Sequence, residues 1–178
     1  PWTAFDGGAF ELAQTAGWFM LDSSSDRLEL YRGLPVVDVV AESGAVGTDY
    51  EDYALSTPVS DYFRSLDFIR ADDRFDVPAL YVDSWYDFGV NETLQLFNQQ
   101  RENALSARAR DNQYVIVTPS THCAWMRPAN SRAGARDVGE WRLDFEDLYL
   151  RWYRYWLDGD DTRITEMARV QYYLMGAN

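Results

Sequence analysis

Hydrophobic residues along this chain change their spacing near residue 75. Before that point they recur at roughly helical intervals, which predicts a first third made of short helices. The segment 36–40 is short and β-branched and fits a strand or a helical turn, of which we favour the turn. The helices expected are residues 10–21, a turn capped by Ser25 or Asp26, residues 36–40, and two short helices within 49–66 separated by Pro58.

After residue 75 the pattern becomes one of short apolar strands alternating with amphipathic helices. Residues 79–82 and 113–118 read as buried strands, the second ended by Pro119, and residues 170–175 as a last strand. Polar loops are expected over 108–112 and 129–139. The helices expected are one capped by Asn91 and running to about 105, and one over 143–157 stopped by Asp158-Gly159. Alternation of this kind predicts an α/β fold with a parallel sheet.

The composition excludes several kinds of partner and of catalytic chemistry for these residues. The 178 residues carry a net charge of −13, which argues against a nucleic-acid partner. All 16 basic residues are Arg, so lysine chemistry is excluded within these residues, and a single Cys and a single His leave few ligands for a transition metal. We expect no metal and no cofactor. No stretch approaches the roughly 20 apolar residues of a membrane span, so no membrane partner is expected.

The two predicted strands each lead into a polar loop that carries a candidate catalytic residue. The first loop delivers Asp87, and the second delivers His122, the only histidine. In α/β enzymes the chemistry lies where parallel strands end, and the order Asp then His is that of α/β-hydrolases. Asp87 would then accept from one imidazole nitrogen of His122, and the other nitrogen would take the proton of a serine.

The serine that would complete the triad is not evident in the sequence. No Gly-x-Ser-x-Gly turn occurs in it. Ser84 and Ser120 flank the acid and the base but lie on no such turn. Cys123 is adjacent to His122, and neighbours on an extended loop should point different ways, which argues against a Cys nucleophile. Acidic clusters at 49–52 and 158–161 lack the spacing of a calcium loop and are expected to be solvated turns.

Two segments resemble the cocaine-esterase-like (CocE/NonD) serine hydrolases, relatives of X-Pro dipeptidyl-peptidases. They are Val77-Pro-Ala-Leu-Tyr-Val-Asp-Ser-Trp-Tyr-Asp87 and Val115-Ile-Val-Thr-Pro-Ser-Thr-His122. The resemblance implies that Asp87 and His122 are the triad acid and base. It also implies that Trp2, Trp18 and Phe88 line an acyl pocket, although core packing is an equal alternative for each aromatic. Trp85 and Tyr86 are expected to brace the acid loop. Trp125 is expected either to line the pocket or to pack in the core.

The resemblance further implies a division of the chain. Residues 1–74 would form a helical cap, 75–165 the second half of an α/β-hydrolase core, and 166–178 the start of a jelly-roll β-domain. The nucleophile would then precede Pro1, and the chain alone should be inactive. We expect a small-molecule ester or short acyl-peptide substrate and, as a partner, the missing part of the same hydrolase; a homo-oligomer is left open. The alternatives are an amide or X-Pro dipeptide hydrolase and a non-catalytic interaction module.

Overall fold

The structure is a computed structural model that describes the chain except for residues 1–3, 7, 22–25, 67–68, 127–130 and 176–178. The chain divides into two compact units, Pro1–Arg70 and Ala71–Asn178, and each is described by itself. Among the described residues, no helix is both long enough and apolar enough to cross a membrane.

The first unit is built from short helices, as the spacing of its apolar residues predicts. Val39, Tyr50 and Met20 are buried at its centre, with Phe10 and Phe19 packed around them. A small hairpin, β1 with β2, precedes the helices and was not predicted. The elements are β1 (Phe5–Asp6), β2 (Ala9–Phe10), α1 (Leu12–Phe19), α2 (Arg27–Leu30), the 3₁₀ turn η1 (Val36–Asp38), α3 (Val39–Glu42), α4 (Tyr50–Leu55) and α5 (Asp61–Ser65).

Local polar residues set several of these boundaries. The Asp26 side chain accepts a hydrogen bond from the Leu28 backbone N–H and so caps α2, which confirms one of the two predicted caps. Residues 36–40 are helical, as favoured. Pro58 lies between α4 and α5, where the two-helix prediction placed the interruption.

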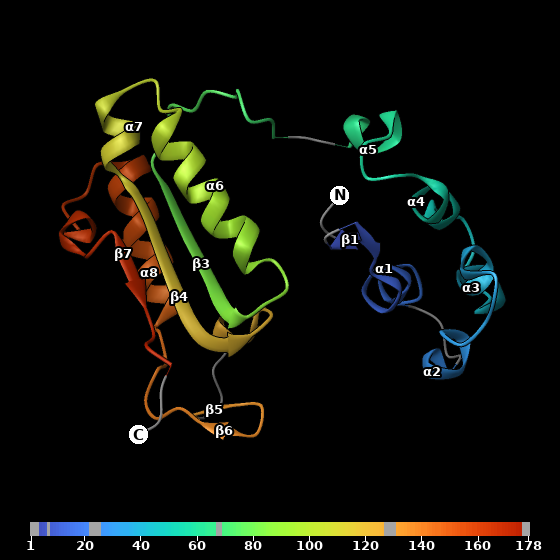
Figure 1. The fold of residues 1–178 in the computed structure, drawn as a ribbon. Coiled ribbons are helices and arrows are strands. Elements are labelled where there is room, and N and C mark those ends of the chain that lie inside the picture. Colours follow the sequence, from blue (N-terminus) through green and yellow to red (C-terminus); the bar gives the residue numbers. More distant parts are fainter. Residues whose placement is uncertain (1–3, 7, 22–25, 67–68, 127–130, 176–178) are drawn as a thin grey trace. The chain divides into compact units, whose positions relative to one another are not determined.

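The second unit contains a parallel three-stranded sheet and is mixed α/β, as predicted at the level of fold class (Figure 1). Its strands are β3 (Ala79–Tyr86), β4 (Gln113–Thr121) and β7 (Val170–Tyr172), in the order β3-β4-β7. The central strand β4 is buried from Gln113 to Ser120. Such a near-continuous buried run is typical of a parallel strand covered on both faces.

Two helices cover the opposite faces of this sheet (Figure 1). On one face, Phe97 of α6 (Val90–Glu102) packs against Val115 and Val117. On the other, Leu148 and Trp152 of α8 (Phe145–Tyr153) pack against alternate residues of the same strands. A π-helical turn (Arg154–Asp158) extends α8, and Gly159 ends it in the left-handed conformation, as predicted for the Asp-Gly pair.

Helix boundaries differ from the prediction at two places. Asn91 is not the cap of α6, because Gly89 occupies that position and the helix already begins at Val90. The polar segment 108–112 is not a loop, since most of it belongs to α7 (Ala107–Asp111). The Ser106 side chain accepts from the Ala109 N–H and starts that helix, a local cap that outweighs the polarity of the segment.

Strand boundaries also differ. Pro119 does not end β4, which continues to Thr121 through an irregular pairing with β3. Such an irregularity accommodates a residue that has no N–H to donate. Within the expected loop 129–139, β5 (Arg132–Ala133) and β6 (Arg136–Asp137) form a short hairpin.

The last strand joins the sheet of the second unit. Val170–Tyr172 pairs in parallel with residues 115–117 of β4, and its neighbours Arg169 and Tyr173 add backbone hydrogen bonds to that strand. The residues expected to open a separate β-domain thus extend the α/β sheet in this structure. Two 3₁₀ turns, η2 (Ala124–Met126) and η4 (Ile164–Glu166), complete the unit.

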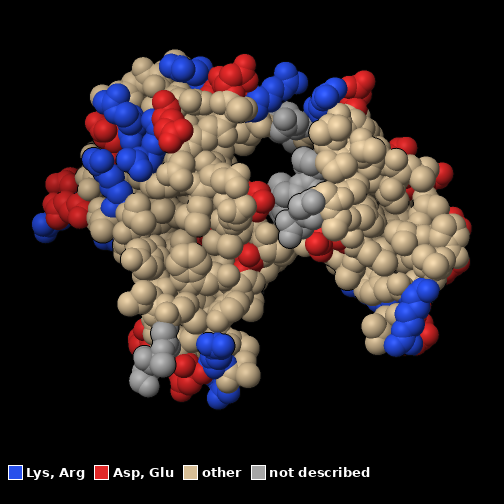
Figure 2. Space-filling view, in the orientation of Figure 1, with Lys and Arg blue, Asp and Glu red and all other residues tan. Residues whose placement is uncertain are grey.

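Charged residues of the second unit are gathered at its ends in the face that Figure 2 shows. Arginine and acidic side chains are interspersed around the end that carries α7, and the surface between the ends is mostly uncharged in this view. No field of a single sign therefore covers this face of the unit.

Candidate functional site

The carboxyl ends of β3 and β4 bring Asp87 and His122 together. Asp87 follows β3 directly, and His122 follows β4 directly. Along most of the two strands, paired residues are 34 positions apart, as in Ser84 with Thr118, but beyond the irregularity Tyr86 pairs with Thr121, 35 positions away. Continuing this shifted register sets His122 opposite Asp87, whereas the original register would have set Thr121 there.

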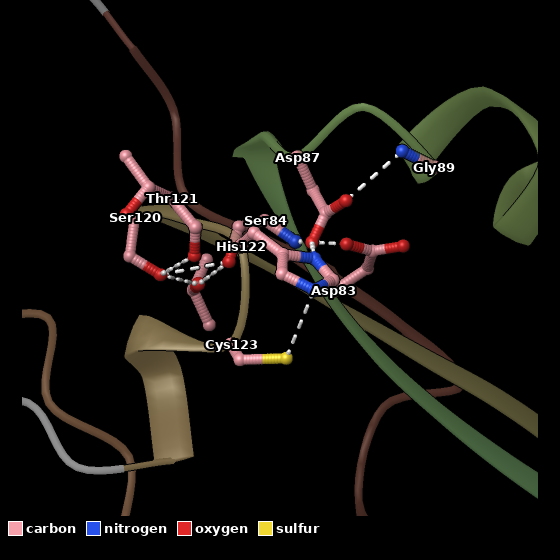
Figure 3. A network of polar contacts seen from close by, with 9 residues as sticks. Asp83, Ser84, Asp87, Gly89, Ser120, Thr121, His122 and Cys123 are labelled. Atoms are coloured by element: carbon pink, nitrogen blue, oxygen red, sulfur yellow. Dashed lines mark hydrogen bonds and ion pairs between the residues drawn. The ribbon is translucent and has the colours of Figure 1, made fainter. Parts of the chain in front are cut away.

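The two side chains are hydrogen bonded (Figure 3). His122 Nδ1 lies 2.7 Å from Asp87 Oδ2, and the backbone N–H of Gly89 donates to Asp87 Oδ1 at 2.9 Å. The Asp87 side chain is only 8% exposed, whereas that of His122 is 49% exposed. Asp87 also precedes the N-terminus of α6, where the helix dipole favours a negative charge. The arrangement has the geometry of an acid that orients an imidazole base.

The second imidazole nitrogen faces the thiol of the next residue. Cys123 Sγ lies 3.5 Å from His122 Nε2, so the expectation that these neighbours point apart is wrong. Cys123 has a φ of 57°, in the left-handed region that non-glycine residues seldom adopt, and this conformation folds its side chain back toward the ring. The thiol is exposed.

Phe88 is the sequence-predicted pocket residue that the structure places beside His122. The two rings lie 4.6 Å apart between centroids and are tilted by 31°. Trp18 lies in the first unit, on α1, where it lines a cavity of about 200 Å³ with Thr15, Phe19 and Tyr53. Trp2 lies outside the described residues.

The other aromatics near the site are held by packing and hydrogen bonds. Trp85 donates its indole N–H to the Tyr173 carbonyl oxygen at 2.7 Å, which ties the end of β3 to the segment after β7. Trp125 is buried and packs edge-on against Phe145 of α8, with ring centroids 4.3 Å apart. Trp125 was expected either to line the pocket or to pack, and in the structure it packs.

A second buried carboxyl group lies close to the pair. Asp83 of β3 is 6% exposed and accepts a hydrogen bond from the Ser84 backbone N–H at 2.7 Å. Burial raises its pKa, hydrogen bonds from Thr93 and from the Ser84 N–H act in the opposite direction, and the charge of Asp87 raises it further.

Three buried hydroxyl groups form a closed triangle between the same two strands. Ser84 Oγ lies 2.9 Å from Thr118 Oγ1 and 2.7 Å from Ser120 Oγ, and the latter two are 2.9 Å apart. The triangle spans the place where the register changes. It therefore fixes the two strand ends from which Asp87 and His122 emerge.

Sequence reasoning placed Ser84 and Ser120 beside the acid and base and did not identify Asp83 or the triangle. The alternation of β3 carries a usable signal, because Asp83 shares a face with Tyr81 and must lie under whatever covers that face. In the described part of the chain, no cluster of three or more His, Cys, Asp or Glu side chains could hold a metal ion.

No protein-family model matches the chain, and no match was found among curated proteins. The function proposed for it therefore depends on the geometry of the site and on the residues that carry the resemblance to serine hydrolases.

Proposed function

We propose that this chain supplies the acid and the base of a Ser-His-Asp triad in a serine hydrolase that cleaves ester or peptide bonds. The observation that carries the proposal is the 2.7 Å contact between His122 Nδ1 and Asp87 Oδ2 at the ends of neighbouring parallel strands. Strand ends are where α/β enzymes place their chemistry. The nucleophilic serine is proposed to lie outside residues 1–178, because the sequence contains no nucleophile turn.

The proposed roles follow from the hydrogen-bonding capacity of each group. An ionised Asp87 can only accept, so Nδ1 of His122 carries the proton between them and Nε2 of the neutral ring keeps a lone pair. Nε2 takes the serine proton as the hydroxyl attacks the carbonyl carbon, and then returns it to the leaving alcohol or amine. Asp87 keeps the ring in the required tautomer and stabilises the imidazolium that forms between the two steps.

The substrate is proposed to be an ester or short acyl-peptide with an apolar acyl group. Phe88 supports this, since its ring lies against that of His122 and is 40% exposed, so it presents apolar surface next to the base. Amide and X-Pro substrates use the same triad and stay as the alternative for this site.

Hydrolysis of p-nitrophenyl esters tests this proposal. Protein expressed from its complete coding sequence should turn over the ester and be blocked by a serine-directed phosphonate, and the His122→Gln variant should lose turnover. Residues 1–178 alone should be inactive. Turnover that survives His122→Gln would exclude the proposed base, and a complete product without hydrolase activity would favour the interaction-module alternative.

A second candidate is supported by one contact, the 3.5 Å separation of Cys123 Sγ and His122 Nε2. In this alternative the exposed thiol, and not a serine, gives its proton to His122 and attacks the acyl carbon. The ester C–O bond then breaks, the alcohol leaves with the proton returned by His122, and the acyl group stays on Cys123 as a thioester. The nucleophile, base and acid would then all lie within this chain. The strained backbone of Cys123 is of the kind that occurs at functional sites.

Acyl transfer to the isolated chain separates the two candidates. Residues 1–178 are incubated with a p-nitrophenyl ester, and the mass of the protein is measured. The thiol alternative predicts an added acyl group that disappears in Cys123→Ala and is reduced in His122→Gln. The serine proposal predicts no acylated species in residues 1–178, and complete protein that keeps its turnover in Cys123→Ala.

A further inference from the structure

The regular pairing of β3 with β4 is interrupted just before the acid. The register changes between Ser84 and Tyr86, so that one residue of β3, Trp85, stands opposite two residues of β4. One of those two is Pro119, which has no backbone N–H to donate. The backbone pairing that joins the two strands elsewhere is therefore irregular two residues before Asp87, where the acid has to be placed.

The side chain of Trp85 makes a hydrogen bond at this irregularity. Its indole N–H donates to the Tyr173 carbonyl oxygen at 2.7 Å, a short distance for a bond of this kind. The backbone N–H of Tyr173 donates in turn to the Val117 carbonyl oxygen of β4 at 2.9 Å. The ring of Tyr172 lies edge-on to the indole, with centroids 6.3 Å apart. Tyr173 thus links the end of β3 to β4 by a route that does not depend on the interrupted pairing.

Trp85 also lies inside the turn that presents the acid. The Asp87 backbone N–H donates to the Ser84 carbonyl oxygen at 3.0 Å, and such a bond between residues three apart closes a turn. Trp85 and Tyr86 are the two central residues of this turn. Because the turn is short, an anchor on Trp85 restricts the backbone from which the Asp87 side chain extends toward His122.

We propose that Trp85 is a positioning residue for the Asp87–His122 pair. Its indole N–H, held by the Tyr173 carbonyl oxygen, fixes the turn that carries the acid. The Gly89 N–H, which donates to Asp87 Oδ1, fixes the carboxylate from the other side of the same loop. The segment after β7 thereby takes part in placing the acid. The inference deepens the proposed function and rests on it for its catalytic meaning.

Nuclear magnetic resonance of the 178-residue chain tests the anchor itself. With ¹⁵N-labelled tryptophan, the Trp85 indole signal is assigned by its loss in Trp85→Phe. Trp85 is 36% exposed, so without the bond its N–H should exchange with deuterated solvent as a free indole does. The bond should slow that exchange by roughly tenfold. Exchange at the rate of a free indole would overturn the proposal.

The only histidine reports whether the anchor positions the acid. The proton between His122 Nδ1 and Asp87 should give one downfield resonance in the wild-type chain. Trp85→Phe keeps a ring but removes the donor, so this resonance should disappear or move upfield as the turn loosens. A resonance that stays at its wild-type position in Trp85→Phe would overturn the positioning role.

The matched control is Tyr172→Leu. It removes the ring that lies against Trp85 but keeps the hydrogen bond to the Tyr173 carbonyl oxygen, so the His122 resonance should stay in place. An equal loss of the resonance in Tyr172→Leu and Trp85→Phe would show that ring packing, and not the indole N–H, holds the turn, and would overturn the proposal.

Kinetics of the complete protein give a third readout. Trp85→Phe should lower kcat for a p-nitrophenyl ester by roughly 2- to 10-fold, the effect of losing one hydrogen bond. KM should stay nearly unchanged, because the proposed role concerns the base and not the binding of substrate. A raised KM with an unchanged kcat would place Trp85 in substrate binding and overturn the positioning role.

The two proposals can fail separately. Indole exchange and the His122 resonance are measured in the chain without substrate, so an inactive complete protein would leave the anchor standing. Conversely, a freely exchanging Trp85 indole would leave the Asp87–His122 pair and its proposed hydrolase role intact. If Trp85→Phe does not fold, the indole signal is assigned through its contact with the Tyr172 ring, and its exchange in the wild-type chain decides the question.

Discussion

The two faces of the sheet differ in kind at the end where the candidate site lies. On the α6 face, the ionisable Asp87 is hydrogen bonded to His122, and the buried carboxyl group of Asp83 lies on the same strand end. On the α8 face, Ser84, Thr118 and Ser120 form a neutral triangle of hydroxyl groups. Asp83 and Ser84 are adjacent on β3, and the alternation of a strand sends them to opposite faces.

The hydroxyl groups on the α8 face hold the two strands together, whereas the groups on the α6 face can ionise. A hydroxyl group both donates and accepts, so three of them can satisfy one another in a closed ring without any net charge. The ring can therefore be fully buried and tie two strands together at little electrostatic cost. Carboxyl groups cannot do this unless one keeps a proton, and so the α6 face is where titration and proton transfer can occur.

The largest effect is expected from Asp87→Asn on the α6 face. The amide cannot accept at both atoms as the carboxylate does, so His122 loses its tautomer and orientation. In the complete protein, kcat for ester hydrolysis should fall by about 10⁴-fold, as removal of a triad acid does elsewhere. The matched control is Asp111→Asn, which breaks only the exposed ion pair with Arg110 and should leave kcat unchanged. Equal kcat values in the two variants would remove Asp87 from the mechanism.

On the α8 face, Ser84→Ala should lower stability more than it disturbs the Asp87–His122 pair. The change deprives Thr118 and Ser120 of one partner each in a buried place, which should cost about 1–3 kcal/mol in the free energy of unfolding by urea. Ser65→Ala removes an exposed hydroxyl that bonds only to the Tyr62 carbonyl oxygen, and should change the same quantity by less than about 0.5 kcal/mol. If Ser84→Ala falls within the range of that control, the triangle does not hold the strands.

Asp83→Asn should change how stability depends on pH. Because the folded-state pKa of Asp83 is raised, the stability that its acid form contributes is complete below the unfolded pKa of about 3.9 and is lost as pH rises through the folded pKa. The asparagine variant has no such loss, so its stability relative to wild type should increase as pH rises above about 4. Urea unfolding at a series of pH values measures the difference. A constant gap between the two proteins would mean that Asp83 titrates alike in the folded and unfolded states.

The smallest effect is expected from Phe88→Leu, which replaces the ring that lies against His122. An aromatic pair contributes about 0.5–1.5 kcal/mol beyond its buried area, so kcat/KM should fall by roughly 2- to 10-fold. Phe88→Tyr keeps the ring and should retain nearly all of the activity. Equal losses in both variants would show that the contact needs more than an aromatic face.

The order of the elements and the contact between Asp87 and His122 could be predicted from the sequence. Both residues directly follow apolar segments that alternate with a helix, and the ends of parallel strands meet at one edge of a sheet. Short-range details were harder to predict, because they depend on single contacts. Ser106 starts α7 within a polar segment, and the register change lets β4 continue past Pro119.

The contacts of Asp83 and Cys123 depend on tertiary structure and on backbone conformation. Asp83 is followed by Ser84 and Trp85 in a strand that begins Ala-Leu-Tyr-Val, and nothing local shows that its carboxyl group is buried and accepts from the Ser84 N–H. The positive φ of Cys123 has no signature in the residue type, since cysteine shows no preference for that region. These two residues are where the site departs from what the pattern indicated.

The extra residue in β4 makes the site depend on chain length as much as on residue type. Without the register change, the present sequence would set Thr121 opposite Asp87 and would leave His122 one step further on, on the other side of the strand. Homologous proteins should therefore either keep this irregular pairing or have one residue fewer in β4 before the histidine.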